Sequence, residues 1–461
     1  MKISKYNKIL ATNDVDRYIL YNTLRDSVFI VDRDAEEVLE GAKGLESLDT
    51  TEVKKLVDEG ILVDDDVDEL ELVRTYYNDI VNDCTSMQFT VATTYDCNLC
   101  CPYCYQSHED FYKGSMNEKV GDLTIKFIKN KVMEEDAKTI YVTLYGGEPL
   151  LNIKEGLRII RTLYQWAKEN DREFYPTTCT NGTLLTREII EAMKNNTIIA
   201  PEHVPLLGQH IITLDGTKEI HNKIKKYRDG SGSFDDIIRA LKMVKEAGVP
   251  FTIKFNLYGE NYSSAKKLID DLIEMGFKGN QLVISLMSNV FTRVVSESNF
   301  PEMPVDDSYR ELNNYALEKG LKVYIDFLPP KCVRCKTLTN SAYVIDPYGD
   351  IYKCWTVMGQ IEHKIGTLDD DGHIKDHRPC ILAQRDIFAI KKCRRCIYLP
   401  ICGGNCAAFA YLKYGHYQAA QCIPNVEFDN WIKIYLKQKY PDKMGKLIIS
   451  RSYKGNLRHG E

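Results

Sequence analysis

The feature that most constrains this chain is the short run CNLCCPYC at residues 97–104. Without Cys100 the run reads C-x3-C-x2-C, and Tyr103 stands immediately before the last cysteine. Three thiolates on one short loop can hold three irons of a [4Fe–4S] cube and leave the fourth iron without a protein ligand. The run therefore predicts an iron–sulfur site at which a small molecule can bind. A zinc pair built on C-x2-C is the alternative interpretation.

Length and composition favour a cytoplasmic enzyme of several domains. A chain of 461 residues is too long for one hydrophobic core and suggests about two or three domains. The net charge of -6 gives no reason to propose nucleic acid or a membrane as partner, and neither a signal-like N-terminus nor a long apolar run occurs. Because the cytosol keeps thiols reduced, the 15 cysteines indicate metal binding rather than disulfides.

Residues 1–83 form the first expected domain, a small winged-helix-like module. Short apolar runs with turn residues between them predict an antiparallel sheet, and two helical patterns follow. The strands are expected at 6–11, 17–21 and 28–31, and the helices at 35–42 and 50–59. The second helical pattern is charge-balanced, which disfavours DNA binding. A domain that only packs is a further alternative, but we favour a module that adds an extended peptide to its sheet edge.

Residues 84–290 alternate between strand and helix patterns. Six β-α units in sequence predict a parallel sheet curved into a partial (β/α)6 TIM-like barrel, with the chemistry on loops at the carboxyl ends of the strands. Strands are expected at 88–93, 139–144, 174–179, 210–214, 251–256 and 281–285, with helices such as 119–132, 155–168 and 235–246 between them. The cysteine loop then follows the first strand.

Beyond about residue 290 the β-α rhythm is lost and cysteines become frequent. Residues 291–330 are interpreted as a bridging region, and residues 331–430 as a separate cysteine-organised domain. This last stretch holds nine of the 15 cysteines, all between 332 and 422. Residues 431–461 are rich in Lys and Arg, so a solvated and partly frayed end is expected from Lys433 onward.

The cysteine loop, at the end of a first barrel strand, resembles the radical S-adenosylmethionine (SAM) superfamily. The resemblance implies that Cys97, Cys101 and Cys104 ligate the cluster and that Cys100 is a bystander. In that family the open iron binds SAM, and one electron from the cluster cleaves it to a 5′-deoxyadenosyl radical that abstracts a hydrogen atom. The cofactor performs the chemistry, and the protein supplies placement and protection.

Other loops match further segments of the same family. The segment 146–149, GGEP, is similar to the glycine-rich segment that receives the SAM amino group, and 180–183 and 213–216 match two others. The family normally has Arg where this chain has Lys225, and Lys cannot give the same two-pronged contact with a carboxylate. The resemblance implies a set of SAM-binding residues: Tyr103 and Leu286 beside the adenine, Thr213 and Lys225 near the carboxylate, and Gly146, Gly147, Glu148 and Asn181.

The C-terminal cysteines resemble the SPASM domain, which holds two auxiliary [4Fe–4S] clusters with interleaved ligands. The resemblance places Cys335, Cys354 and Cys406 on the first auxiliary cluster, and Cys393, Cys396, Cys402 and Cys422 on the second. Cys332 is proposed from proximity as the fourth ligand of the first cluster; without it that cluster keeps an open iron. Zinc on the 393–406 group is the alternative.

Four cysteines remain outside these sets. Cys84, Cys100, Cys179 and Cys380 are interpreted as small apolar residues rather than ligands. Cys179 stands at a strand end that faces the expected site, so a contact role is an alternative for it.

These observations predict a radical SAM enzyme that oxidises a ribosomally made precursor peptide, forming a thioether or carbon–carbon cross-link. The first module would bind the peptide's leader, and the expected cofactors are SAM and three [4Fe–4S] clusters. An electron donor such as flavodoxin or ferredoxin is implied. One alternative is an anaerobic sulfatase maturase, which is disfavoured because Trp355 follows Cys354 where those enzymes have a catalytic Asp. The other is a non-catalytic iron–sulfur scaffold.

Overall fold

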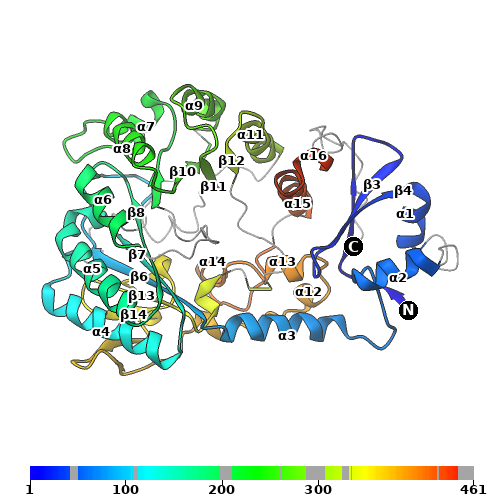
Figure 1. The fold of residues 1–461 in the computed structure, drawn as a ribbon, viewed down its shortest axis with the longest axis horizontal. Helices are drawn as coiled ribbons and strands as arrows, with labels where there is room; N and C mark the ends of the chain where they lie inside the picture. The colour runs from blue at the N-terminus through cyan, green and yellow to red at the C-terminus, as the bar shows by residue number, and fades with distance from the viewer. Residues whose placement is uncertain are drawn as a thin grey trace.

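The computed structural model describes residues 1–41, 50–104, 106, 113–197, 210–259, 261–286, 307–323, 332, 333, 335–422 and 425–444. Figure 1 shows a barrel-like half, which carries most of the helices, and a small N-terminal module at the opposite end. The long helix α3, Glu69–Asn82, runs along one side from the module toward the barrel. The C-terminal helices α12–α14 lie beside α3, between the two ends (Figure 1).

The barrel is built on six parallel strands that lie in the sheet in the order of the sequence. On β6 the fully buried residues Met87, Phe89 and Val91 alternate with half-buried Gln88 and Thr90. One face of the strand thus packs against helices while the other faces the concave side, as in a half-closed barrel. The six strands are β6 Ser86–Thr94, β7 Thr139–Gly146, β8 Glu173–Thr180, β9 His210–Thr213, β10 Phe251–Leu257 and β11 Gln281–Leu286.

The helices cover the outer face of this sheet, as amphipathic spacing predicts. On α5 the buried residues Ile159, Ile160, Leu163 and Ala167 recur at helical spacing and join one continuous core. Helix α4 starts where the Asn117 side chain accepts a hydrogen bond from the backbone N–H of Val120, 3.0 Å away. The helices are α4 Glu118–Glu134, α5 Ile153–Glu169, α6 Arg187–Asn195, α7 Lys218–Ile224, α8 Phe234–Glu246 and α9 Tyr262–Glu274. All six expected strands and the three named barrel helices are present.

The C-terminal part is continuous with the barrel sheet, which corrects the expectation that the β-α rhythm ends near residue 290. Helix α11, Asp307–Glu318, leads to β12, Lys322–Val323, which extends the sheet in parallel beyond β11. At the other edge β13, Ala342–Ile345, pairs in parallel with β6. Antiparallel strands then continue the same sheet: β14 Asp350–Tyr352, β15 Gly366–Leu368 and β16 Ile374–Lys375. The cysteine-rich region is thus attached directly to the first barrel strand.

The N-terminal module contains the expected three-stranded antiparallel sheet, β2 Asn7–Ala11, β3 Arg17–Asn22 and β4 Val28–Asp32. The helices α1, Arg33–Leu39, and α2, Thr50–Asp58, follow it as predicted. A second small sheet, β1 Lys2–Ile3 with β5 Leu62–Val63, was not predicted. Helix α3 was also missed, although its first turn belongs to the module: the carboxylate of Glu69 accepts hydrogen bonds from Ser4 and from the backbone N–H of Lys5.

The C-terminal segment is packed rather than frayed up to residue 444, which corrects the expectation for Lys433 onward. On helix α15, Asn425–Lys439, Phe428, Ile432 and Leu436 are buried in the main core. Gln438 hydrogen-bonds both backbone groups of Val323 in β12, at 3.0 and 3.2 Å. Lys439 pairs with Asp26 of the module at 2.7 Å. This helix therefore joins the barrel edge to the module, and α16, Pro441–Met444, follows it.

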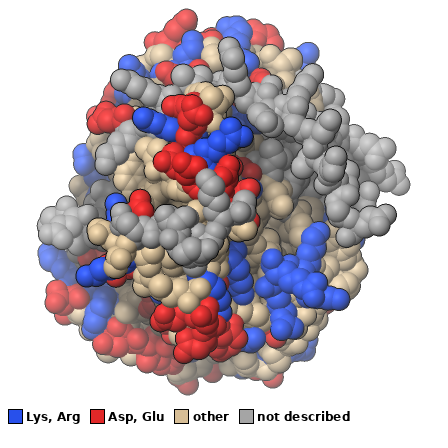
Figure 2. Space-filling model, turned by 90° about the vertical axis from the view of Figure 1, so that its right-hand side faces the viewer, with Lys and Arg blue, Asp and Glu red and all other residues tan. Residues whose placement is uncertain are grey.

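The remaining helices are short and belong to the cysteine-rich region: α12 Lys391–Arg394, α13 Leu399–Cys402 and α14 Ala407–Tyr414. Of the helices in the described residues, none combines the length and apolar character needed to cross a membrane. Figure 2 views the module end of the molecule and shows acidic and basic side chains in separate patches.

Candidate active site

The three motif cysteines lie together on the loop that leaves β6. Cys101 lies with Leu99, Tyr103 and Tyr258 in one small core, and Cys97 and Cys104 pack against it. The loop is held by backbone pairing: the N–H of Cys100 donates to the carbonyl of Lys226 at 2.8 Å, and Leu99 bridges to Tyr227. The Cys100 side chain is exposed. The fold thus separates Cys100 from the other three, as the spacing predicted.

The thiols of this loop are shielded from water and close enough to influence one another. Burial raises the pKa of Cys97 to about 12, and the Cys101 and Cys104 thiolates contribute to the rise. Burial raises the pKa of Cys104 to about 11, with a further contribution from Cys101. Such thiols are protonated at neutral pH until a cation replaces the proton.

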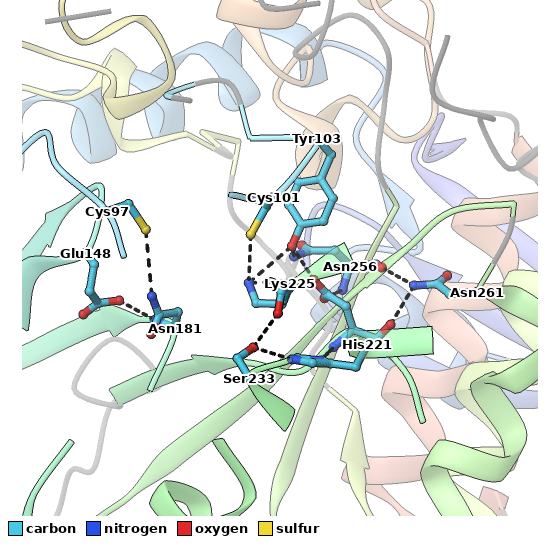
Figure 3. A network of polar contacts seen from close by, with 11 residues as sticks. Cys97, Cys101, Tyr103, Glu148, Asn181, His221, Lys225, Ser233, Asn256 and Asn261 are labelled. Atoms are coloured by element: carbon cyan, nitrogen blue, oxygen red, sulfur yellow. Dashed lines mark hydrogen bonds and ion pairs between the residues drawn. The ribbon is translucent and has the colours of Figure 1, made fainter. Parts of the chain in front are cut away.

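A buried network of charges lies beside Cys101 (Figure 3). The Lys225 ammonium is 3.8 Å from the sulfur of Cys101, 3.4 Å from the hydroxyl of Tyr103 and 3.9 Å from the carboxylate of Asp215. The Tyr103 hydroxyl donates to Asp215 and accepts from Asn256 at 3.2 Å. Burial lowers the pKa of Lys225, but the negative charges of Cys101, when it is ionised, and of Asp215 outweigh burial, so the net pKa is raised. Lys225 therefore stays charged next to the cysteine loop.

Further hydrogen bonds hold Asp215 and Lys225 in place. The backbone N–H of Asp215 donates to Nδ1 of His221 at 3.0 Å, so the proton of the neutral ring resides on Nε2 and points to the hydroxyl of Ser233, 3.1 Å away. Ser233 in turn donates to the carbonyl of Lys225 at 2.7 Å. Burial lowers the pKa of His221 to about 3, with Lys225 contributing, which keeps the ring neutral. Asn261 completes the network through the carbonyls of Asp215 and Asn256.

Gly146 and Gly147 are required by the protein's own backbone. Gly146 has φ +128°, a conformation that favours glycine, and a Cβ there would collide with the carbonyl oxygen of Thr94. A Cβ at Gly147 would collide with the carbonyls of Tyr95 and Asp96. That this glycine-rich segment receives the SAM amino group stays a prediction. The structure shows that the two glycines bring the end of β7 against the residues that directly precede Cys97.

Glu148 and Asn181 connect neighbouring loops of the site. The fully buried carboxylate of Glu148 accepts from Thr180 at 2.6 Å, from the N–H of Asn181 at 2.8 Å and from the N–H of Leu150 at 3.1 Å. These protein donors give Glu148 a structural role in this site. The Asn181 side-chain amide is 3.9 Å from the sulfur of Cys97 and donates to Asn98 at 2.9 Å. Asn181 therefore does face the cysteine loop.

The remaining two residues expected to contact SAM are Thr213 and Leu286, for which the structure shows fewer contacts with the cysteine loop. Thr213 is buried at the end of β9, two residues before Asp215, and pairs in register with Lys254 of β10. The backbone of Leu286 ends β11 opposite Leu257, and its side chain lies outside the described residues. Sequence reasoning missed the roles of His221, Ser233, Asn256 and Asn261. Only Asp215, within the segment 213–216, had a sequence signal.

Several C-terminal cysteines lie in or against two small hydrophobic clusters, while Cys380, Cys396 and Cys402 pack against the main core. Cys354 belongs to one small cluster with Val333 and Leu338, and Cys406 packs against it. Cys393 belongs to the other with Ile387 and Leu399, and Cys396 packs against that one. Cys332 is in the second cluster, with Cys393, rather than beside Cys354 as expected. The segment around Cys332 and Cys335 thus passes from one group to the other.

The module contributes directly to the second group. Tyr6 and Leu24 of the module lie in the same cluster as Cys332 and Cys393. The Thr23 hydroxyl donates to the carbonyl of Ile397 at 2.6 Å. From α3, Arg74 lies 4.5 Å over the ring of Phe388, and Tyr77 packs edge-on against the same ring at 5.4 Å. The module is therefore in contact with the cysteine-rich region.

The donor set of the cysteine loop has the chemistry that an iron–sulfur cluster requires. Within the part of the chain that the structure describes, no three His, Cys, Asp or Glu side chains converge as one metal ion needs. A four-iron cube requires thiolates that surround it, each bound to a different iron. The loop of Cys97, Cys101 and Cys104 offers three such thiols, with the Lys225 ammonium as a nearby positive charge. The residues present thus fit a cluster with one open iron.

The comparisons with known proteins agree with this geometry. Residues 91–272 match the model of the Radical SAM superfamily. The matched segment begins in β6 and ends in α9. The chain carries a radical SAM domain and is a radical SAM enzyme related to maturases.

Two relatives and one solved structure show more closely which proteins this chain is similar to. The chain is 21% identical to the radical SAM cyclopropyl synthase TigE of Paramaledivibacter caminithermalis, over 90% of this chain and 91% of TigE. It is 29% identical to the serine-type anaerobic sulfatase-maturating enzyme of Bacteroides thetaiotaomicron, over 78% of this chain and 94% of that enzyme. The structure of Streptococcus suis SuiB bound to its precursor peptide SuiA superposes with a TM-score of 0.52 at 16% identity, covering 91% of this chain and 100% of SuiB.

Proposed function

We propose that this protein modifies a ribosomally made precursor peptide, oxidising a residue of the peptide to form a thioether or a carbon–carbon bond. The observation that carries the proposal is that a small N-terminal module, which could bind a peptide, is attached to a radical SAM barrel through α3 and α15. TigE and SuiB are matched over 90% and 91% of this chain, whereas the sulfatase-maturating enzyme is matched over 78%. SuiB was solved with a precursor peptide bound, which supports a peptide substrate here.

In this proposal Cys97, Cys101 and Cys104 hold the SAM-binding cluster. When bound there, SAM and the cluster supply a 5′-deoxyadenosyl radical that abstracts a hydrogen atom from the substrate. The chain's own residues hold and shield that site. Lys225 places a positive charge beside Cys101, Asn181 faces Cys97, and the buried Asp215–His221–Ser233 chain keeps Lys225 fixed. Fixed charges in a water-poor site act more strongly than they do in water.

The module is the proposed leader-binding element. Strand β4 is an edge of its three-stranded sheet, and its residue Ile30 is 43% exposed. An edge strand offers unpaired backbone groups to an extended peptide. Such an oxidation removes two electrons from the peptide. One leaves with the hydrogen atom that the 5′-deoxyadenosyl radical takes, and the auxiliary clusters, which the cysteines of residues 332–422 would hold, would accept the other. A flavodoxin or ferredoxin would supply the electron for the first cluster.

The decisive experiment combines anaerobically reconstituted protein, SAM, a reductant and each small peptide that a reading frame next to this gene is found to encode. The proposal expects 5′-deoxyadenosine together with a peptide that has lost two hydrogen atoms in mass. A peptide shortened by its leader should be modified far more slowly. Formation of 5′-deoxyadenosine with no change of any neighbouring peptide contradicts the proposed substrate but leaves the radical enzyme intact.

A sulfatase maturase is the second candidate, because the relative with the higher identity has that activity. Against it stands Trp355, which follows Cys354 and is 48% exposed. Its ring stacks on Tyr145 of β7 at 5.5 Å, so an aromatic surface occupies this position instead of a carboxylate. Incubation with a sulfatase peptide carrying Cys or Ser distinguishes the two candidates: formylglycine formation would favour the maturase.

A further inference from the structure

One stretch of the cysteine-rich region departs from the charge balance of the rest of the chain. Asp and Glu make up 66 of the 461 residues and the net charge is -6, yet neither residue type occurs between positions 387 and 426. The same stretch carries four cations within five positions, namely Lys391, Lys392, Arg394 and Arg395. We call these four residues the α12 cations, because three of them belong to α12 and Arg395 directly follows it.

The α12 cations present their charge to solvent. All four are exposed, and within the described residues none of their side chains forms a hydrogen bond or an ion pair. Exposed cations of the barrel helices do pair: Lys218 lies 2.6 Å from Asp235, and Arg187 lies 2.8 Å from Glu246. The charge of the α12 cations is therefore available to a partner.

The spacing of these residues concentrates the charge on one face of the helix. Lys391, Arg394 and Arg395 stand three and four positions apart, so their side chains are neighbours, and like charges at this spacing destabilise a helix. Cys393 stands between them in the sequence and is buried, in the cluster that contains Leu399. Because no acidic side chain of the stretch offsets the repulsion, the arrangement suits a partner that supplies the negative charge.

The character of the surface around α12 limits the kind of partner. No large apolar side chain of residues 362–413 is exposed, so this surface lacks the apolar anchors on which tight interfaces depend. Transient electron-transfer complexes are small, and complementary charge guides their association. Cys393 lies within α12, and Cys396 follows it closely; both are expected to hold the second auxiliary cluster. A partner docked on the α12 cations would thus lie beside these cysteines.

We infer that the α12 cations are the docking surface for a small electron-transfer protein with an acidic surface. This inference rests on the proposed function, because each peptide oxidation would leave one electron on the auxiliary clusters. The docked carrier, in its oxidised form, would take that electron and be reduced by it. The cations steer the carrier to this surface and hold it there, and they take no part in the chemistry at Cys97.

The test measures the binding of a purified acidic flavodoxin to the anaerobically reconstituted full chain, by titration calorimetry without SAM or peptide. Lys391→Glu combined with Arg395→Glu should weaken binding about tenfold or more at low salt, and high salt should remove most of that difference. Lys375→Glu combined with Arg378→Glu, at two exposed cations of the same region, is the matched control and should bind as the unaltered protein does. SAM cleavage driven by a chemical reductant should be the same in all three proteins.

Two further measurements complete the design. Iron content shows whether the reversed charges disturb the clusters; if iron falls, Lys391→Gln combined with Arg395→Gln replaces the first variant and should also weaken binding. Unchanged flavodoxin binding in the Gln variant overturns the inference, as does a tighter complex with a duplex oligonucleotide than with flavodoxin. An unaltered protein that binds flavodoxin through these cations but modifies no peptide overturns the proposed substrate alone, so the two failures are distinguishable.

Discussion

The two cysteine-bearing regions of this protein are built in different ways. Around Cys97 the thiols sit on one loop at the ends of long parallel strands, and a buried ion pair of Lys225 and Asp215 stands behind them, with side chains 6% and 0% exposed. In the C-terminal region the cysteines come from short loops and one-turn helices scattered over residues 332–422. The first site is held by the ends of long parallel strands. The second is held by short strands at the sheet edge, by two small hydrophobic clusters and by the iron–sulfur clusters it is expected to bind.

Because the two regions are built differently, we expect their folding to depend on iron to different degrees. Without iron, the first site should keep its geometry, because the barrel core holds its loops independently of the metal. The second region should depend on metal, since metal-binding free energy contributes to the folding of small sites with little core of their own. Four changes test this contrast, beginning with the one that should matter most.

Replacing Cys97, Cys101 and Cys104 together by Ala should abolish SAM cleavage while leaving the fold intact. Iron should fall from about twelve to about eight per chain, since one four-iron cube is lost. Iron analysis and 5′-deoxyadenosine assays on the reconstituted protein measure both. Cys100→Ala, at the exposed cysteine of the same loop, is the matched control and should retain both iron and cleavage. Retention of about twelve irons in the triple variant would exclude these three as ligands.

Lys225→Met should destabilise the protein by about 3–5 kcal/mol, because it leaves the buried Asp215 carboxylate without its cation. Thermal or denaturant unfolding of the protein without clusters measures the loss. The neighbouring Lys226 is exposed, and Lys226→Met should change stability by less than about 0.5 kcal/mol. Equal stability of the two variants would mean that the pair does not support the site.

Arg385→Met tests the C-terminal region in the same way. The buried guanidinium donates to the carbonyl of Asn405 at 3.0 Å and to that of Ala419 at 2.7 Å, and so joins the loops before Cys406 and Cys422. Loss of these charged hydrogen bonds should cost about 3 kcal/mol and lower the yield of auxiliary clusters on reconstitution. Arg378→Met, at an exposed arginine of the same region, should load normally. Normal loading of Arg385→Met would show that metal binding alone orders these loops.

The last change, at His221, tests a dependence of stability on pH. Its pKa in the folded protein is about 3, below the ordinary value of 6.5, so the unfolded chain binds the extra proton first. Stability is therefore complete above pH 6.5 and falls as the pH drops toward 3, by at most about 1.4 kcal/mol per pH unit from this group.

In His221→Asn, which can still accept the N–H of Asp215, that part of the slope should disappear. The remaining slope from His210, whose pKa burial lowers to about 4, should persist and serves as the internal reference. Unfolding curves between pH 4 and 7 measure both proteins. An identical slope in the variant would show that His221 is not held neutral.

The sequence predicted the barrel well because each strand is a short apolar run that ends at a chemically distinctive loop. The strand expected at 251–256 is Phe251–Leu257, and the loop motifs gather at one end of the sheet. Helix α15 was hidden by its charged residues, although Phe428, Ile432 and Leu436 recur at helical spacing. The partners of Asp215 depend on how β9 aligns with β10. The packing of Cys332 with Cys393 and Tyr6 depends on contacts between residues far apart in the chain. No local pattern reports either.

The central claim is that the loop of Cys97 generates a radical that acts on a peptide. The most direct measurement supplies the precursor peptide fully deuterated at carbon and follows the mass of the 5′-deoxyadenosine formed. We expect deuterium to move from the peptide to 5′-deoxyadenosine, and the triple cysteine variant to form none of the product. A 5′-deoxyadenosine that never acquires deuterium, while the peptide is nevertheless modified, would contradict it.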